Sequence, residues 1–235
     1  FCGLENFTYW IYNMSYLVNP YLYASSGEWY SYEDSSTYSI PVGPNLFSSP
    51  LPQYYDVGSG NEFYKFKYKA SLSTSYAGGN YNGSISMWVG NLLKTSSQSG
   101  GYCPEGAFIT TGRHRHNSGS TDQSYFAQNW NDSGGTCNVP TGTGCPQVSQ
   151  INDYGCGDGL IVGSQNVELE YDGDDTGGTA YFRFYNSGFS SPPTSTNTWT
   201  INAMRELRYF LIGGRSDPSG NVSGSITYQK FEWFT

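Results

Sequence analysis

Short segments in which polar and apolar residues alternate recur along most of the chain, and they constrain the fold more than any other feature. The turns between them are rich in Gly, Pro, Asn and Asp, as in GGNYNG and RSDPSGN. No window of useful length has the apolar spacing of a long helix. The pattern predicts an all-β fold, a β-sandwich or jelly roll of two antiparallel sheets. The clearest expected strands are 62–70, 84–89, 107–116, 165–171, 180–185, 208–212 and 225–234.

The whole chain, 1–235, is expected to form one domain, because β-sandwiches of 235 residues commonly do so. Residues 1–60 are a less regular N-terminal segment. Residues 117–159 are Gly-rich, with weak strand signals, and contain Cys137, Cys145 and Cys156. Such a long excursion predicts a disulfide-pinned loop that caps one edge of the sandwich.

Alternation also predicts which side chains are buried. In EFYKFKYKA, Phe63 shares a face with the lysines at 65, 67 and 69, whereas Tyr64, Phe66 and Tyr68 share the opposite face. The lysine face should be wet, and the aromatic face buried or binding. In SISMWVG, Ile85, Met87 and Val89 form the expected core side. Trp88 lies opposite them, either packed or as a platform for a sugar.

The cysteines indicate where the protein works. Cys2, Cys103, Cys137, Cys145 and Cys156 lie mostly in Gly- and Pro-rich loops and lack CxxC spacing, which favours disulfides and a secreted, extracellular protein. Their odd number leaves one thiol free or paired with another molecule. The opening residues lack the marks of a retained signal peptide, so we expect a processed, soluble product. Sequons at Asn6, Asn13, Asn82, Asn131 and Asn221 would accept glycans in a secretory pathway.

Charge and hydropathy exclude two classes of partner. A net charge of -8 disfavours nucleic acid, whose binding needs clustered cations. No stretch approaches the roughly 20 apolar residues of a membrane-spanning helix.

The C-terminal third has a recognisable strand order. VELEYDGDDTGGTAYFRFYNSG is followed by a Pro/Ser/Thr loop, then by YFLIGG, an Asp/Gly loop and ITYQKFEWF. This order resembles the concanavalin A-like (laminin-G type) jelly rolls. The resemblance implies a fold that hosts legume-type lectins, glycoside hydrolases and polysaccharide lyases, and hence a glycan or polysaccharide partner. The ExDxxE motif of laminarinase-like hydrolases is absent, and neither RxELR nor YFKxGxYxQ of alginate-lyase types stands intact.

The segment GRHRHN holds both histidines of the chain. Paired arginines, Arg113 and Arg115, could neutralise a uronate carboxylate, and His114 or His116 could remove its C5 proton, as a polysaccharide lyase requires. A tyrosine on a neighbouring strand would protonate the leaving oxygen; Tyr181, Arg183 and Tyr185 share one face there. A solvated strand edge and a two-histidine metal site stay open as alternatives.

Two carboxyl clusters offer other chemistry. Glu168 and Glu170 share one face of a strand. They could be the two carboxyl groups of a glycoside hydrolase, or they could form the solvent-facing side of an amphipathic strand. Asp172, Asp174 and Asp175 could ligate calcium, although an Asp/Gly hairpin needs no metal. The sequence therefore predicts no cofactor, with calcium left open as the alternative.

Aromatic residues are the broadest clue to function. Flat rings stack on sugars, and the candidate platforms are Trp29, Tyr30, Tyr54, Tyr55 and Trp88. The leading interpretation is a secreted carbohydrate-active jelly roll, a polysaccharide lyase on a uronate glycan. The alternatives are a non-catalytic lectin or carbohydrate-binding module, and a structural surface glycoprotein that assembles with itself through tyrosine-rich faces.

Overall fold

The computed structural model describes residues 16–18, 27–43, 54–77, 83–93, 95–98, 101–104, 108–115, 122–129, 163–174, 176–201, 204, 206–216 and 221–235. Every regular element in this part of the chain is a β-strand. No helix long and apolar enough to cross a membrane occurs among these residues.

The strands form two sheets, which are named here after strands near their centres. The β7 sheet runs in the order β1 (Tyr16–Val18), β5 (Tyr54–Asp56), β15 (Tyr209–Ser216), β7 (Gly83–Gly90), β10 (Phe108–Arg115) and β11 (Asp122–Asn129), with β4 (Val42–Gly43) beside β15. The β6 sheet runs in the order β14 (Ser195–Ile201), β13 (Gly177–Tyr185), β12 (Gly163–Asp174), β6 (Lys65–Ala77), β16 (Asn221–Phe234) and β2 (Trp29–Asp34), with β3 (Tyr38–Ser39) beside β16.

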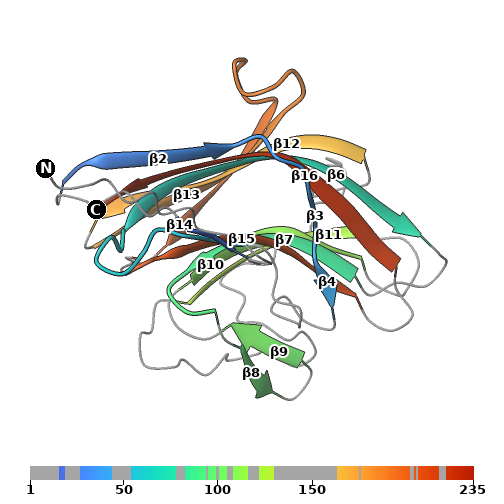
Figure 1. The fold of residues 1–235 in the computed structure, drawn as a ribbon, viewed down its shortest axis with the longest axis horizontal. Helices are drawn as coiled ribbons and strands as arrows, with labels where there is room; N and C mark the ends of the chain where they lie inside the picture. The colour runs from blue at the N-terminus through green and yellow to red at the C-terminus, as the bar shows by residue number, and fades with distance from the viewer. Residues whose placement is uncertain are drawn as a thin grey trace, which may run out of the picture.

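The two sheets stack face to face, as Figure 1 shows, and the chain crosses between them repeatedly. It passes from β5 to β6 to β7, from β11 to β12, and from β14 through β15 to β16. Apart from short β1 and β4, which run parallel to their neighbours, the pairing is antiparallel. This is the predicted jelly-roll sandwich. A small hairpin of β8 (Thr95–Gln98) and β9 (Gly101–Pro104) lies beneath the β7 sheet.

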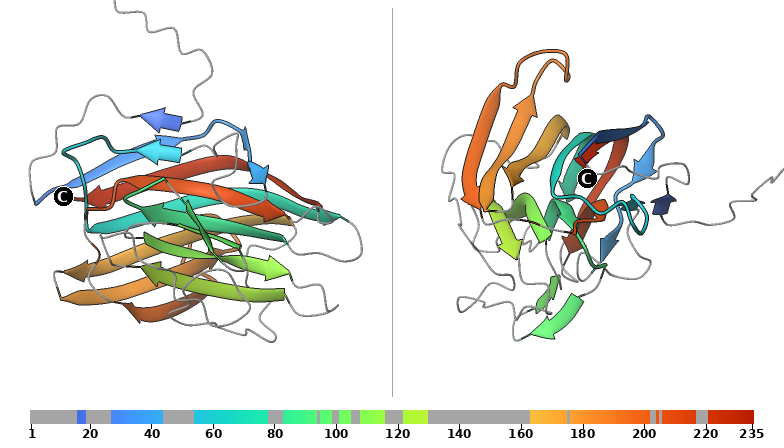
Figure 2. Two further views of the ribbon diagram at one scale, coloured as in Figure 1. Left: turned by 90° about the horizontal axis from the view of Figure 1, so that it is seen from below. Right: turned by 90° about the vertical axis from the view of Figure 1, so that its left-hand side faces the viewer.

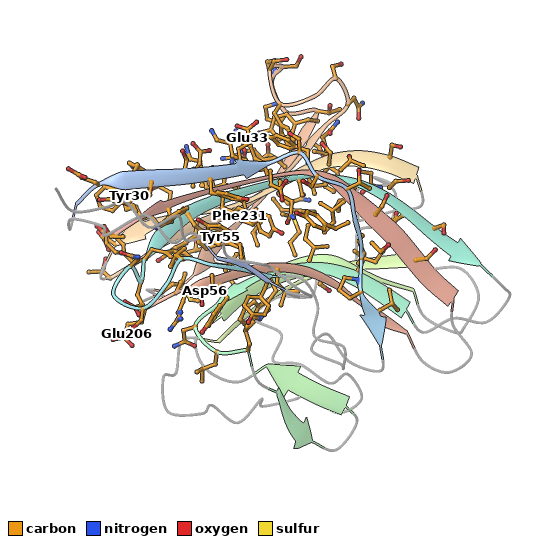
Figure 3. The ribbon with its side chains drawn as sticks, viewed as in Figure 1. Tyr30, Glu33, Tyr55, Asp56, Glu206 and Phe231 are labelled. Carbon is orange, nitrogen blue, oxygen red and sulfur yellow. The ribbon has the colours of Figure 1, made fainter. Side chains whose placement is uncertain are left out.

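Aromatic rings fill the space between the sheets. Among the described residues, the ten largest fully buried side chains are all Trp, Tyr or Phe. Tyr55 stacks on Phe231 with ring centroids 4.5 Å apart, and Phe63 stacks on Phe210 at 4.9 Å. In Figure 3 Tyr55 and Phe231 lie between the sheets, whereas Glu33 lies on the outer side of the β6 sheet. Much of the aromatic content of the sequence is therefore core.

All seven expected strands are present, but the predicted alternation fails at one point. The face with Phe66 and Tyr68 is buried, as predicted, whereas Phe63 is buried too and Tyr64 is only half-buried. The reason is that β6 begins at Lys65, while Phe63 forms an isolated bridge with Leu207. The strand period therefore does not extend back to Phe63.

The segment 117–159 is not all loop, because it contains β11. This strand pairs with β10 over eight residues, from Asp122 to Asn129. Its mostly polar sequence, DQSYFAQN, hid it from pattern analysis. Residues 130–162 lie outside the described residues, as do Cys2, Cys137, Cys145 and Cys156. Of Cys103, only the backbone in β9 is described. The disulfides therefore stay a prediction.

Candidate functional site

The residues expected to form a lyase site do not lie on neighbouring strands. Strand β10, with Arg113, His114 and Arg115, lies in the β7 sheet between β7 and β11. Strand β13 lies in the other sheet, between β12 and β14. Arg183 donates to Glu168 and Glu170, on the face of β12 opposite the core residues Val167 and Leu169.

The polar face of β13 therefore looks away from the β7 sheet. The side chains at 113–115 and all of His116 lie outside the described residues. The expected arrangement of β10 beside Tyr181, Arg183 and Tyr185 is wrong, because the strands belong to opposite layers of the sandwich.

The candidate sugar platforms are divided among three environments. Tyr55 is buried in the core, and Tyr30 is half-buried against it, stacked on Trp233 at 6.0 Å. Trp88 is fully buried in a separate cluster with Leu211 on the outer side of the β7 sheet; Tyr54 packs against that cluster. Neither Tyr55 nor Trp88 therefore presents a ring face to solvent.

Trp29 is the exception, since half of its surface is exposed. It lies at one end of the outer face of the β6 sheet, meaning the face turned away from the β7 sheet. Its ring centroid is 5.6 Å from that of Phe234, and Phe234 meets Tyr64 edge-on at 5.5 Å. We call these three residues the aromatic corner. Register places them together, because Phe234 pairs with both Trp29 and Lys65.

Two lysines border the aromatic corner. The Nζ of Lys67 lies 5.6 Å from the centre of the Trp29 ring, and the Nζ of Lys65 lies 5.9 Å from the centre of the Phe234 ring. Both distances suit cation–π contacts. The corner therefore combines a flat apolar surface with polar groups at its margin.

A network of paired charges, which we call the ionic ladder, continues along the outer face. Its members come from four adjacent strands and are Lys67, Lys69, Glu168, Glu170, Arg183, Lys230 and Glu232. The Nζ of Lys67 lies 3.6 Å from Glu170, that of Lys69 lies 3.3 Å from Glu168, and that of Lys230 lies 3.0 Å from Glu232. Each cation of the ladder thus has a carboxylate partner.

Arg183 joins the two carboxylates that were candidates for hydrolysis. Burial alone would lower the pKa of Arg183, but its hydrogen bonds and charge interactions with Glu170 and Glu168 outweigh burial and raise it above the usual value. Glu168 is only 3% exposed and accepts a further hydrogen bond from the Tyr185 hydroxyl at 3.2 Å. Glu168 and Glu170 are therefore held by cations and bonded to neighbours, an arrangement typical of a structural network.

A second group of rings, which we call the Phe189 patch, lies at the far end of the ladder. Phe189 contacts Tyr185 at 5.1 Å and Tyr228 at 5.6 Å between ring centroids. Burial, reinforced by the charge of Glu168, raises the pKa of Tyr185 to about 12. Burial, reinforced by Glu33, likewise raises the pKa of Tyr228 to about 12. Both phenols therefore stay protonated at neutral pH, and the Tyr185 hydroxyl donates its proton to Glu168.

The carboxylates proposed for calcium have other partners. Asp172 lies 3.3 Å from the Nζ of Lys65, and Asp174 accepts hydrogen bonds from the backbone and hydroxyl of Thr176, both at 2.7 Å. Asp175 lies outside the described residues, among which no group of three or more His, Cys, Asp or Glu could hold a metal. Calcium stays a prediction.

The sequons also stay predictions. Asn6, Asn13, Asn82 and Asn131 lie outside the described residues, and Asn221 is described by its backbone alone, at the start of β16.

Sequence analysis had selected Trp29 but missed Tyr64, Phe234 and Phe189. Alternation predicted that Tyr64 shares a buried or binding face with Phe66 and Tyr68, whereas the structure places it against Phe234, just before β6 begins. Phe234 and Phe189 lie far from Trp29 in sequence, and only the pairing of β16 with β2 and β6 and the folding back of the β13–β14 loop bring them to this face. The sequence signal that could have found Phe234 is the alternation in ITYQKFEWF, which places Tyr228, Lys230, Glu232 and Phe234 on one face of the strand.

No family model matches this chain, and no curated protein matches it. Several solved structures are similar to it. Peanut lectin is 13% identical, with a TM-score of 0.49, covering 87% of this chain and 97% of the lectin. A seed lectin of Lotus tetragonolobus is 11% identical (TM-score 0.47; coverage 90% and 96%).

The CBM2 module of an evolved Dit protein of Lactobacillus casei BL23 phage J-1 is also 11% identical (TM-score 0.43; coverage 89% and 97%). Lectins are thus among the similar structures.

Proposed function

We propose that this protein is a secreted, non-catalytic carbohydrate-binding protein whose binding surface is the outer face of the β6 sheet. The half-exposed ring of Trp29 is the observation on which the proposal rests. An exposed indole is costly to leave in water, and its flat apolar face suits the C–H face of a pyranose. Next to it, Lys67, Glu232 and Glu170 supply the donors and acceptors that sugar hydroxyls require.

The same face gives little support to catalysis. Glycoside hydrolysis needs one carboxyl to donate a proton and a second one to act as base or nucleophile. Glu168 and Glu170 instead share Arg183, and each has a lysine partner as well. The lyase interpretation lacks its assembled site, since β10 and β13 lie in different sheets. Binding without cleavage is the function that the described geometry favours.

A glycan array probed with the wild-type protein, Trp29→Ala and Leu92→Ala tests this proposal. Leu92 is the matched control, because this residue is also exposed, at 41%, but lies just after β7, a strand of the other sheet. We expect the wild type and Leu92→Ala to bind the same glycans and Trp29→Ala to lose at least about tenfold in affinity. Incubation of the bound glycan with wild-type protein should release no fragments.

Two results would overturn the proposal. Equal binding by Trp29→Ala would remove the aromatic corner from the site. Absence of binding to every glycan, together with polymers of the protein in size-exclusion chromatography, would favour the self-assembling surface glycoprotein instead.

A further inference from the structure

We propose that the ligand is an extended, neutral oligosaccharide that contacts both the aromatic corner and the Phe189 patch, lying along the ionic ladder between them. This inference rests on the proposed function, and it adds the length and the charge class of the glycan. A site for one terminal sugar would need only the corner.

Strand register fixes the separation of the two groups of rings. Phe234, in the corner, pairs with Lys65 of β6, and Tyr228, in the patch, pairs with Ser71. Six residues of β-strand span about 20 Å, which is longer than a single pyranose ring. A ligand that stacks at both ends must therefore be an oligosaccharide.

The ladder between the rings has the chemistry of a hydrogen-bonding track. Its carboxylates accept hydrogen bonds, while its lysines and Arg183 donate them. Because every ladder cation already has a carboxylate within 4 Å, none is left to neutralise a uronate. The ladder therefore favours neutral sugars, in contrast to the uronate glycan expected from the sequence.

Phe189 is held in position before any ligand arrives. It lies in the connection between β13 and β14, which rises from the β6 sheet in Figures 1 and 2. Backbone hydrogen bonds close this connection from Thr194 to Phe184 at 2.6 Å and from Ser191 to Gly188 at 3.3 Å. The ring also lies 5.8 Å from the Nζ of Lys69. Such preorganisation lowers the entropy cost of binding.

The test is a length series measured by isothermal titration calorimetry. The probes are mono- to hexasaccharides of glucose, galactose, mannose and xylose, with oligomers of galacturonate as the charged arm. The proteins are the wild type, Trp29→Ala, Phe189→Ala, Phe189→Tyr and the Leu92→Ala control. Circular dichroism and thermal unfolding check that each variant folds. Phe189→Tyr keeps an aromatic ring at this position, and so separates loss of the ring from any change of the loop caused by Phe189→Ala.

For the neutral series that binds, affinity should rise with length and reach a plateau. Phe189→Ala should bind the hexasaccharide about tenfold more weakly while leaving the disaccharide unchanged, whereas Phe189→Tyr should behave as wild type. Trp29→Ala should weaken both lengths. Galacturonate oligomers should bind more weakly than neutral oligomers of equal length.

Three outcomes would refute the inference. If monosaccharide and hexasaccharide bind equally, or if Phe189→Ala changes nothing, the extended site is wrong while the proposed function stands. If the charged series binds best, the neutral class is wrong. If no glycan binds at all, the proposed function itself fails and the inference fails with it.

Discussion

Replacement of Arg183 by Met tests whether the ionic ladder is part of the folded structure or a loose set of surface charges. Arg183 donates to Glu168 and to Glu170, and the side chains of Arg183 and Glu168 are only 18% and 5% exposed. Its removal leaves two adjacent carboxylates, one of them buried, without their shared cation. Removing one partner of a buried pair commonly costs about 3 to 5 kcal/mol.

The expected cost here is somewhat smaller, because two lysines stay in place. Lys69 lies 3.3 Å from Glu168, and Lys67 lies 3.6 Å from Glu170. We therefore expect Arg183→Met to lower the free energy of unfolding by about 2 to 3 kcal/mol. For a chain of this size, that corresponds to a fall in Tm of roughly 4 to 12 °C.

Urea unfolding followed by tryptophan fluorescence measures the loss, with Lys230→Met as the control. Lys230 and Glu232 form a more exposed pair, at 28% and 26%, so the control should lose less than about 1 kcal/mol. Adding Glu168→Gln to Arg183→Met should recover part of the stability, since it removes the buried charge. The reasoning is refuted if Arg183→Met costs no more than Lys230→Met, or if Glu168→Gln makes the double variant less stable still.

The remaining predictions concern alkaline pH and the pairing of β12 with β13. The raised pKa of Tyr185, about 12 against an ordinary 10, means that its contribution to stability is complete below about pH 10 and is lost as pH rises towards about 12. Tyr185→Phe should therefore flatten the pH dependence of unfolding over that window, and an unchanged slope would contradict the assignment. Gly178→Ala should lower stability by roughly 1 to 3 kcal/mol, because a Cβ there would lie 2.3 Å from the Cα of Gly173 and 2.4 Å from the carbonyl oxygen of Asp172. Thermal unfolding measures the change, with Thr179→Ala as the control. Equal Tm values for the two variants would show that the hairpin accommodates the extra methyl group at little cost.

The sequence by itself determined the fold class, because alternation over short segments is a local property of strands. The seven clearest strands, the buried Phe66 and Tyr68 and the wet lysines of β6 all follow from a period of two residues. Polar strands such as β11 and β14 gave no such signal, since an edge strand needs no apolar face.

Only the tertiary structure decided which residues meet. The strands that carry Arg113 and Arg183 were expected to be neighbours, yet the chain crosses between layers and places them in opposite sheets. The same crossings bring Trp29, from near one end of the chain, against Phe234, from the other, and leave Trp88 covered. Alternation fixes the face of a strand on which a side chain lies, but pairing between distant strands fixes its neighbours, and that pairing depends on how all the aromatic rings pack together in the core.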